Sequence, residues 1–535
     1  MQRLDIAALG TRSCAVGDAC VRLLALALLV LLTACASLEP VTLKPTYALA
    51  PNPLDPLVEV SAASVKAHEQ AGFRALPVSA YSMDARLALA QAARHSLDLQ
   101  YYLLQDDTTG HVLLRAIRDA ARRGVRVRVL VDDMYTANSD RLLSALAAHD
   151  NIEVRLFNPF PAGRSFEWSR WMFSLLDFAR VNHRMHNKLF IADGAFAIAG
   201  GRNIADEYFF HSGAGNFIDF DLLVTGGRTM AQLSAVFDSY WNSRRVYPLS
   251  HLVRPDADKD ELQRRFEEST RDALSAFPAP AADLLDPLGY KPLSEDLKHP
   301  PVGLLFGNID VFADDPEKVT GRSEAGDDAT TVTSQAMSVF ATATQDLTLA
   351  SPYFVPGRAG MRQMSSVRER DVPVSVLTNS LAANDEPFAS AAYARYRHTM
   401  LKLGIDIREV AADPLKVTRG YTLKSAPISR SHAKIAVIDH RRVFVGSMNM
   451  DFRSSRENTE LGLVVHSPEL AEQVLGLLEL VKAGSYRLQL DAAGNIVWAI
   501  ERDGNTPTFD EEPDVGTWRR LKILLLAPFV PESLL

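Results

Sequence analysis

Hydrophobic and polar residues alternate along most of the chain with the two periods that distinguish helices from strands. Residues 83–96 have the apolar spacing of a helix, and 97–104 follow as an apolar strand. Residues 111–124 repeat the helical spacing and end on a glycine, after which 125–131 alternate with period two. This order of helices and strands predicts an α/β fold.

The same order of elements returns about 250 residues later in the chain. Residues 347–356 repeat the first strand, and 372–378 repeat the second. We interpret the chain as an internal duplication, with one α/β half at 83–250 and another at 336–500. Residues 251–335, which are rich in Pro, Asp and Glu, are predicted to be an insertion between the repeats.

The segment before the first half predicts export from the cytoplasm. Three arginines precede an apolar run at 23–32. This run is too short to cross a bilayer comfortably and is typical of a signal peptide. The letters LTAC at 32–35 resemble a bacterial lipobox, so we expect a lipoprotein signal peptide at 1–34 and a lipid on Cys35. An uncleaved anchor and a plain secretory signal are the alternatives.

Two further features bear on where the protein resides. Residues 35–82 contain many Pro, Ala and Ser residues and are predicted to form a tether between the lipid and the folded part. Ala36 differs from the aspartate that retains Gram-negative lipoproteins in the inner membrane. We therefore expect a periplasm-facing protein of the cell envelope, with the outer membrane favoured slightly over the inner membrane.

The composition excludes several classes of chemistry. Hydrophobic residues make up 47% of the 535 residues, as in an ordinary globular protein, and the net charge of −8 gives no general attraction to nucleic acid. The only cysteines, Cys14, Cys20 and Cys35, precede the globular part, which therefore has no thiol nucleophile or disulfide. The histidines show no metal-ligand spacing, and we expect neither a metal nor another cofactor.

Two stretches with identical spacing carry the candidate chemistry. Each reads His-x-Lys-x4-Asp-x6-Gly-(Gly/Ser)-x-Asn, and they begin at His186 and His432. Each is predicted to be a β-hairpin whose turn begins at Asp193 or Asp439, and we assign these two aspartates structural roles. Because side chains alternate along a strand, the histidine and the lysine of each copy share one face.

The hairpins also predict which residues lie beside one another. Folding each about the two residues after the Asp places the Asn beside the His and the small residue beside the Lys. The predicted pairs are His186–Asn203, Lys188–Gly201, His432–Asn449 and Lys434–Ser447. An imidazole, an ammonium and a carboxamide then gather on one face of each hairpin.

This set of side chains suits a phosphoryl centre. Lysine and asparagine can stabilise the non-bridging oxygens, and imidazole can act as nucleophile or general acid. Two histidines can divide these roles, if their surroundings hold one neutral and the other protonated. We expect a carboxylate to orient each ring, and Asp219 and Glu460 lie at similar distances downstream of the first and second motif. A buried hairpin with a satisfied histidine could explain one copy, but the repetition favours a site.

The doubled motif resembles the HKD signature of the phospholipase D superfamily. The resemblance extends from residue 83 to the C-terminus and is weakest between 250 and 335. Segments such as GVRVRVLVDD, VNHRMHNK, GGRNIADEYF and SPYFVP are similar to those of bacterial cardiolipin synthases, particularly the C-type branch.

The resemblance implies a fold and a set of catalytic residues. The fold would contain two pseudo-twofold-related α/β halves with mixed sheets flanked by helices, and the active site would lie at their interface. Chemistry would be metal-independent and pass through a phosphohistidine. The residues that match the family motif are His186, Lys188, Asn203, His432, Lys434, Ser447 and Asn449. Gly201 stands where serine is commoner in the family.

The resemblance also implies a reaction. In the C-type branch a phosphatidyl group passes from one phospholipid to phosphatidylglycerol, which gives cardiolipin. We assign His186 as the nucleophile and His432 as the acid/base, although the two motifs are nearly symmetric. A hydrolytic phospholipase D, with the same residues and water as acceptor, is the main alternative. A nuclease and a non-catalytic lipid-binding protein are disfavoured by the acidic net charge and by the two intact motifs, respectively.

Two aromatic segments are candidates for membrane contact. Residues 165–182 are interpreted as a core helix in preference to a lipid-facing one. In the tail at 501–535, the segment 517–531 combines a tryptophan, basic residues and an apolar run, and we expect it at a membrane interface. The expected partners are phospholipid substrates and the membrane surface, without nucleic acid, and the sequence leaves the oligomeric state open.

Overall fold

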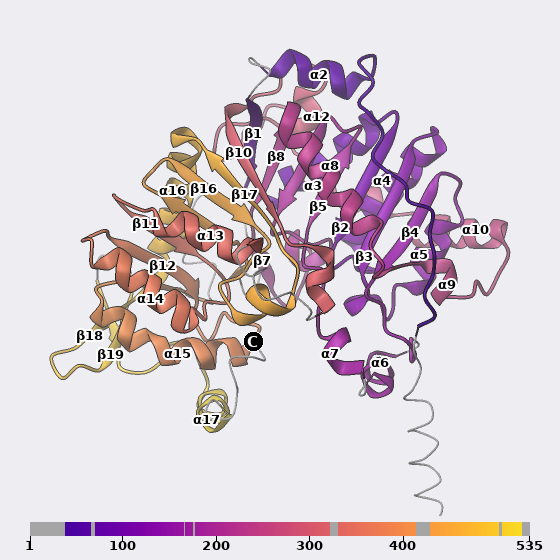
Figure 1. Ribbon diagram of the computed structural model, residues 1–535. Helices are drawn as coiled ribbons and strands as arrows, with labels where there is room; N and C mark the ends of the chain where they lie inside the picture. The colour runs from indigo at the N-terminus through magenta and orange to yellow at the C-terminus, as the bar shows by residue number, and fades with distance from the viewer. Residues whose placement is uncertain are drawn as a thin grey trace, which may run out of the picture.

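The computed structural model describes residues 38–65, 70–164, 166–174, 177–320, 330–412, 429–501 and 505–526. Within these ranges the protein consists of two α/β halves that lie side by side, the first indigo to magenta and the second orange to yellow (Figure 1). The predicted signal peptide and Cys35 lie outside the described residues.

The first half is built on a mixed sheet with the strand order β9–β4–β3–β2–β5–β6–β8–β1. Strands β2, β3 and β4 run parallel to one another, and the other pairings are antiparallel. The strands are β1 Ala71–Leu76, β2 Ser96–Tyr101, β3 Arg126–Asp132, β4 Ile152–Phe157, β5 Leu189–Ala192, β6 Phe196–Gly200, β8 Asp221–Thr225 and β9 Val246–Pro248. Helices connect the parallel strands, as such crossovers require.

A side-chain cap marks the start of some helices in this part of the chain. Helix α4, for example, starts after Asp107, whose side chain accepts a hydrogen bond from the Gly110 amide. The helices up to the second repeat are α2 Pro56–Ser64, α3 Ser79–Ala92, α4 Thr108–Arg122, α5 Asp140–Ala147, α6 Glu167–Phe173, α7 Phe178–Val181, α8 Gly227–Trp241, α9 Leu249–Leu252, α10 Lys259–Ser269, α11 Ala273–Ala276 and α12 Leu293–Asp296. Short 3₁₀ turns are η1 Asp133–Tyr135, η3 Asp206–Tyr208 and η4 Pro316–Thr320.

The second half repeats this architecture. Its strands β13–β12–β11–β15–β16–β17 follow the order of β4–β3–β2–β5–β6–β8, and the duplication predicted from the sequence is confirmed. The strands are β11 Leu347–Ala350, β12 Val374–Asn379, β13 Asp406–Val410, β15 Ile435–Ile438, β16 Arg442–Gly446, β17 Leu461–His466, β18 Ser485–Leu490, β19 Ile496–Ala499 and β20 Thr508–Phe509. The helices are α13 Val332–Ala341, α14 Gly357–Arg368, α15 Pro387–Lys402, α16 Pro468–Ala483, α17 Thr517–Leu526 and the π-helical turn η7 Arg453–Glu457.

One strand from the predicted insertion joins the two halves. Strand β10 (Leu305–Ala313) pairs with β1 through its first residues and with β17 through the remainder, so that 18 strands form one continuous sheet. The segment 251–335 is therefore partly a component of the core sheet. Its polar composition concealed this, because only alternate residues of β10 are buried at its centre.

The predicted tether is shorter than expected. Residues 35–82 include helix α2 and strand β1, and all six residues of β1 are buried. Strand β1 lies between β8 and β10 in the sheet, so the folded part begins before residue 83. The glycine and arginine in β1 weaken the apolar alternation by which a strand is recognised.

A hydrophobic core shared by both halves lies beneath the centre of the sheet. Phe237 and Trp241 of α8 belong to the same buried cluster as Val474 and Leu478 of α16, together with apolar residues of β1, β8, β15, β16 and β17. Each such side chain contributes about 1.5–3 kcal/mol when it is withdrawn from water. The shared core fixes the position of one half relative to the other.

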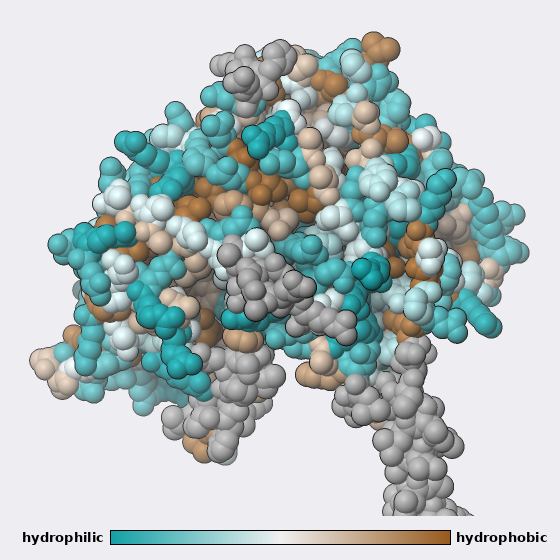
Figure 2. Space-filling model, viewed as in Figure 1, coloured by the Kyte–Doolittle hydropathy of each residue, from teal (hydrophilic) through white to brown (hydrophobic). Residues whose placement is uncertain are grey.

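The surface is mixed rather than uniformly apolar. Hydrophilic side chains predominate on the face shown in Figure 2. Across the described part of the chain, no helix combines the length and apolar character needed to cross a membrane. The predicted core helix at 165–182 is wrong: the described residues of this segment form the short helices α6 and α7, and Phe166 and Trp168 are exposed.

Candidate active site

Both predicted hairpins are present, but their register differs by one residue from the prediction. Ala192 pairs with Phe196 in β5–β6, and Ile438 pairs with Arg442 in β15–β16. Each loop therefore has three residues, with left-handed backbone at its start, instead of two. The predicted pairs His186–Asn203, Lys188–Gly201, His432–Asn449 and Lys434–Ser447 are each wrong by one position. The small residue and the asparagine lie beyond β6 and β16, and the turns that follow these strands position them.

The motif aspartates fix these loops to the neighbouring strands. Asp193 accepts hydrogen bonds from the amides of Arg94, His95 and Ser96 at the start of β2. Asp439 accepts the equivalent bonds from the amides of residues 344–346 before β11. These contacts give both aspartates a structural role and align each hairpin with its sheet.

The two histidines are held by carboxylates from opposite halves. His186 Nδ1 lies 2.9 Å from Glu460 Oε2, and His432 Nδ1 lies 2.7 Å from Asp219 Oδ2. The structure therefore brings both predicted carboxylates to the histidines, but it crosses them, whereas the downstream spacing within each half suggested uncrossed pairs. All four side chains are buried, and residues His186 and His432 are 6% and 5% exposed, respectively.

Backbone pairing across the interface between the two halves, here called the seam, explains why the carboxylates are exchanged. The His186 amide donates to the Thr459 carbonyl at 2.9 Å, and the His432 amide donates to the Ile218 carbonyl at 2.7 Å. A small parallel sheet of β7 (Asn216–Ile218) and β14 (Ser429–Ser431) continues the second contact. Each histidine thus enters the seam beside the strand that leads to the other half's carboxylate.

Each motif lysine follows its histidine by two residues, in the segment that leads into β5 or β15. Lys188 Nζ and Lys434 Nζ each donate to the carbonyl oxygen of their own motif histidine at 2.6 Å. Lys434 Nζ also lies 2.9 Å from Nδ1 and 3.1 Å from Nε2 of His432. Burial lowers the pKa of Lys434 to about 8 and holds the pKa of Lys188 well below its usual value.

Burial also sets the charge of the two imidazoles. Burial, together with the charges of Lys188 and Lys434, lowers the pKa of His186 to about 4, although the Glu460 carboxylate acts in the opposite direction. Burial followed by the charge of Lys434 lowers the pKa of His432 as well. Both rings are therefore neutral near pH 7 in the free protein, and Lys434 from the second half acts on the ring of the first.

The two carboxylates stay ionised in spite of their burial. Burial alone would raise the pKa of Glu460, but attraction to His186 and Lys188 and the Ser447 hydrogen bond outweigh it and hold the pKa at about 2. Burial is likewise outweighed at Asp219, where His432 and Lys434 lower the pKa of the carboxyl. An ionised acceptor at Nδ1 keeps the proton on that nitrogen and leaves Nε2 unprotonated.

The two copies of the site are not equivalent. Ser447 Oγ donates to Glu460 Oε2, and Ser454 Oγ donates to Oε1 at 2.8 Å. At the matching position in the first copy is Gly201, where an added Cβ would lie 2.1 Å from Asp219 Oδ1. The shorter carboxylate occupies the space of the missing side chain, so Gly201 is required by Asp219.

The two motif asparagines also differ. Asn203 accepts from the Leu103 amide at 3.2 Å and donates to the Tyr208 hydroxyl at 2.9 Å, so its carboxamide is engaged on both sides. Asn449 is 7% exposed, and its Oδ1 has no hydrogen-bond partner among the described residues. Asn449 is therefore the carboxamide available to a ligand.

Several residues that complete the site were not predicted. Ser454 connects the Asn449 amide to Glu460, and the Glu460 amide donates to Asp314 Oδ2 at 2.9 Å. The Tyr102 ring meets His186 edge-on with centroids 5.0 Å apart, and Tyr208 meets His432 in the same way at 5.1 Å. None lies inside the repeated motif, and only the tyrosine-rich letters QYYLL gave a signal of unusual composition.

Similarity to known proteins agrees with this geometry. The family described as "Cardiolipin synthase, PLD-like domain" matches residues 87–241 and 337–479, one segment in each half. Cardiolipin synthase C of Escherichia coli (strain K12) is 35% identical over 480 residues, which cover 87% of this chain and 96% of that protein. Cardiolipin synthase 1 of Staphylococcus aureus (strain MRSA252) is 26% identical over 385 residues, which cover 71% of this chain and 61% of that protein.

Among solved structures, the fold resembles that of phosphatidylserine synthase from Haemophilus influenzae Rd KW20. The TM-score is 0.52 with 15% sequence identity, and the match covers 78% of this chain and 87% of the other. The family match in both halves and the Escherichia coli relative carry the assignment. The chain belongs to the phospholipase D superfamily and, within it, to the PLD-like cardiolipin synthase family.

Proposed function

We propose that this enzyme transfers a phosphatidyl group from one phospholipid to phosphatidylglycerol and so forms cardiolipin. The observation that carries the proposal is the seam, where two histidines, each paired with a carboxylate of the other half, lie with both motif lysines. The relatives named cardiolipin synthase support the choice of donor and acceptor class.

In the first step His186 acts as the nucleophile. Glu460 accepts a hydrogen bond from the Nδ1–H group of His186, which leaves the electron pair of Nε2 available. Nε2 attacks phosphorus and forms a P–N bond. The bond from phosphorus to the leaving alcohol oxygen breaks, and His432 gives that oxygen a proton. The lysines and Asn449 stabilise the negative charge that develops on the non-bridging oxygens.

The second step reverses the proton transfer. The hydroxyl group of phosphatidylglycerol loses its proton to His432 while its oxygen attacks phosphorus, and the P–N bond to His186 breaks. His432 must be protonated when the first step begins, although its pKa is lowered in the free protein. An anionic phosphodiester that pairs with Lys434 neutralises the positive charge that opposes protonation of His432. Its own negative charge also stabilises the protonated ring, so substrate binding favours protonated His432.

Hydrolysis is the competing reaction, since water can replace the acceptor alcohol at the same residues. The purified protein, incubated with phosphatidylethanolamine and phosphatidylglycerol, is expected to yield cardiolipin, detected by lipid mass spectrometry. Phosphatidic acid without cardiolipin would overturn the transferase proposal in favour of a phospholipase. Cardiolipin appearing in a host that lacks its own synthases, only when this protein is expressed, would extend the result to the cell.

The asymmetry at Gly201 gives a specific expectation. A Gly201→Ser substitution, which installs the residue commoner in the family, should lower kcat/KM by about 100-fold, because the new Cβ displaces Asp219 from His432. Ser447→Gly is the matched control, because it removes a hydroxyl without crowding a carboxylate, and its loss should be smaller. Full activity of Gly201→Ser, with an unchanged thermal melt, would contradict the role given to this glycine.

We also propose that the protein docks on a membrane surface. Trp168 of α6 and Trp518 of α17 are 64% and 83% exposed, and both helices lie on the lower side of the molecule in Figure 1. Tryptophans are favoured at the membrane interface, where the ring meets both apolar and polar groups. A lipid on Cys35, which the lipobox-like letters LTAC predict, would hold the periplasm-facing enzyme there.

The anchor and the docking surface can be separated experimentally. Cys35→Ser should move the protein from the membrane fraction toward the soluble one. In that background, replacing both Trp168 and Trp518 with Ser should weaken co-sedimentation with phosphatidylglycerol vesicles by roughly tenfold or more. Leu54→Ser is the matched control: Leu54 is 81% exposed and lies two residues before the start of α2, which is on the upper side in Figure 1. Equal weakening by Leu54→Ser would refute the assigned surface.

A further inference from the structure

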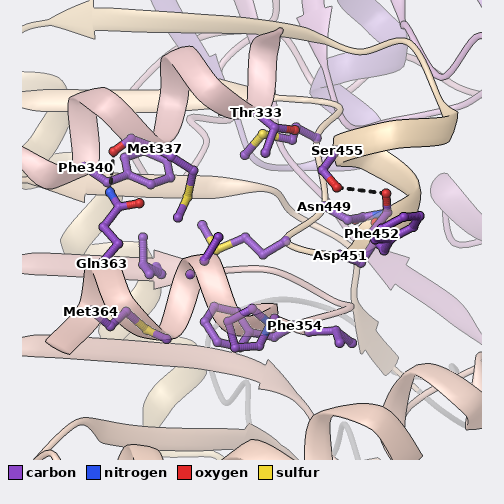
Figure 3. A pocket seen from close by; sticks show the side chains of 18 of the residues that line it. Thr333, Met337, Phe340, Phe354, Gln363, Met364, Asn449, Asp451, Phe452 and Ser455 are labelled. Atoms are coloured by element: carbon purple, nitrogen blue, oxygen red, sulfur yellow. Dashed lines mark hydrogen bonds between the residues drawn. The ribbon is translucent and has the colours of Figure 1, made fainter. Parts of the chain in front are cut away.

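A cavity of about 660 Å³ lies within the second half, beside the second motif (Figure 3). Helices α13 and α14 form two of its walls, and the segment 448–456 forms another. Its lining is mainly apolar and includes two phenylalanines, Phe340 and Phe354, and four flexible thioethers, Met337, Met364, Met448 and Met450. Ligand sites in proteins commonly have this volume and character, and methionine side chains adapt to varied apolar shapes.

The cavity reaches the catalytic motif at one end. Asn449 and Asp451 line it there, whereas Phe340 and Gln363 lie at the opposite end in Figure 3. Asn449 is buried, and its Oδ1 has no partner among the described residues, so this acceptor oxygen can receive a hydrogen bond from a donor group on a ligand, such as a headgroup hydroxyl. An elongated ligand in the cavity would therefore place its polar end at the reacting centre.

Two positive charges border the cavity. Arg358 and Arg362 of α14 belong to its lining, are exposed, and form no salt bridge with any described residue. Their guanidinium groups complement the negative charge of a phospholipid headgroup. An apolar interior with cations on its border suits an anionic lipid.

We propose that this cavity binds one acyl chain of the phospholipid whose phosphate reacts between His186 and His432. This inference rests on the proposed function and adds to it a chain-binding site with named walls. The Asn449 end receives the glycerophosphate part, and the methionines surround the chain. The cavity, rather than the catalytic motif, then makes the enzyme respond to acyl-chain length.

A substitution that fills the cavity tests the proposal. Met337 of α13 projects into the cavity, and Met337→Trp should occupy the space of the chain. Its neighbour Ser338 is exposed and is not part of the lining, so Ser338→Trp places the same ring on the same helix outside the cavity. Both variants keep the catalytic residues unchanged.

The readout is kcat/KM for phosphatidylglycerol with short (dihexanoyl) and long (dioleoyl) chains, presented in the same detergent micelles. The wild type and Ser338→Trp are expected to prefer the long-chain substrate. Met337→Trp should lower kcat/KM for that substrate by about tenfold or more, while turnover of the short-chain substrate changes little. A photoreactive phosphatidylglycerol with a diazirine near the end of its chain should also cross-link to α13 or α14 in the wild type and not in Met337→Trp.

The outcomes separate this inference from the proposed function. No turnover of either substrate by the wild type would refute the proposed reaction, while cross-linking in α13 or α14 would still support the chain site. An active wild type, with Met337→Trp showing the same chain preference and the same cross-links, would refute the cavity. Equal loss on short and long chains in a folded Met337→Trp would also refute it, because the damage would then lie at the reacting centre.

Discussion

The His432→Ala variant is expected to lose turnover and yet to acquire a phosphatidyl group on His186. The substrate for this experiment is a phosphatidyl ester of p-nitrophenol, whose leaving group departs without a proton donor. His186 retains Glu460 at Nδ1 and a neutral ring, so its Nε2 can still attack phosphorus. Without His432 nothing deprotonates the acceptor, and the P–N bond persists. Turnover of the natural substrate should fall by at least about 10⁴-fold.

Mass spectrometry of the peptide that contains His186 measures the trapped group. His186→Ala is the matched control and should show neither turnover nor a label, while thermal melts show that both variants remain folded. A label on His432 in the His186→Ala protein would reverse the assigned roles. Retained turnover in either variant, or a folded His432→Ala that never becomes labelled, would refute the two-histidine scheme.

The Glu460→Gln variant should lose about 10³- to 10⁴-fold in kcat/KM, because a neutral amide cannot stabilise the charge that develops on His186. Glu460 also accepts from Ser447 and Ser454, so an amide would face two hydroxyl donors as well as the Nδ1 proton. A change in the pH profile should accompany the loss. The carboxylate raises a pKa of His186 that burial lowers to about 4, so its removal should move the acid limb of kcat/KM to lower pH.

Ser454→Ala provides the comparison for Glu460→Gln. It removes a contact to the same carboxylate at 2.8 Å but leaves the negative charge in place. We expect a loss below about tenfold and an acid limb at the same pH as in the wild type. A Glu460→Gln protein that is slower but keeps the wild-type acid limb would show that Glu460 only supports the local fold. An acid limb that moves equally in both variants would exclude charge as the cause.

The elements near the motifs could be predicted because their signals are local. The repeated spacing around His186 and His432 identified both hairpins, and the alternation of helices and strands identified the two halves. The register was missed because the backbone after Asp193 and Asp439 adopts left-handed conformations that make the loops one residue longer. The letters alone do not distinguish a two-residue loop from a three-residue loop here.

The crossed carboxylates could not be predicted, because the exchange is a property of tertiary structure. Asp219 and Glu460 were identified as the orienting groups, but spacing along the chain says nothing of which half supplies the partner. Strand β10 was hidden for a related reason, since its polar residues face away from the core while its role depends on strands distant in sequence. The requirement for glycine at 201 likewise emerges only when the Asp219 side chain is in place.

The crossed pairing has a consequence for how the enzyme can fail. Loss of either half takes away one imidazole and, at the same time, the anion that aligns the other. We therefore expect a partly unfolded molecule to lose the whole reaction, and not to stop after the first step with a lipid bound to a histidine. Because the crossed pairs make each histidine depend on both halves, a damaged molecule is expected to be inactive and not to accumulate an intermediate.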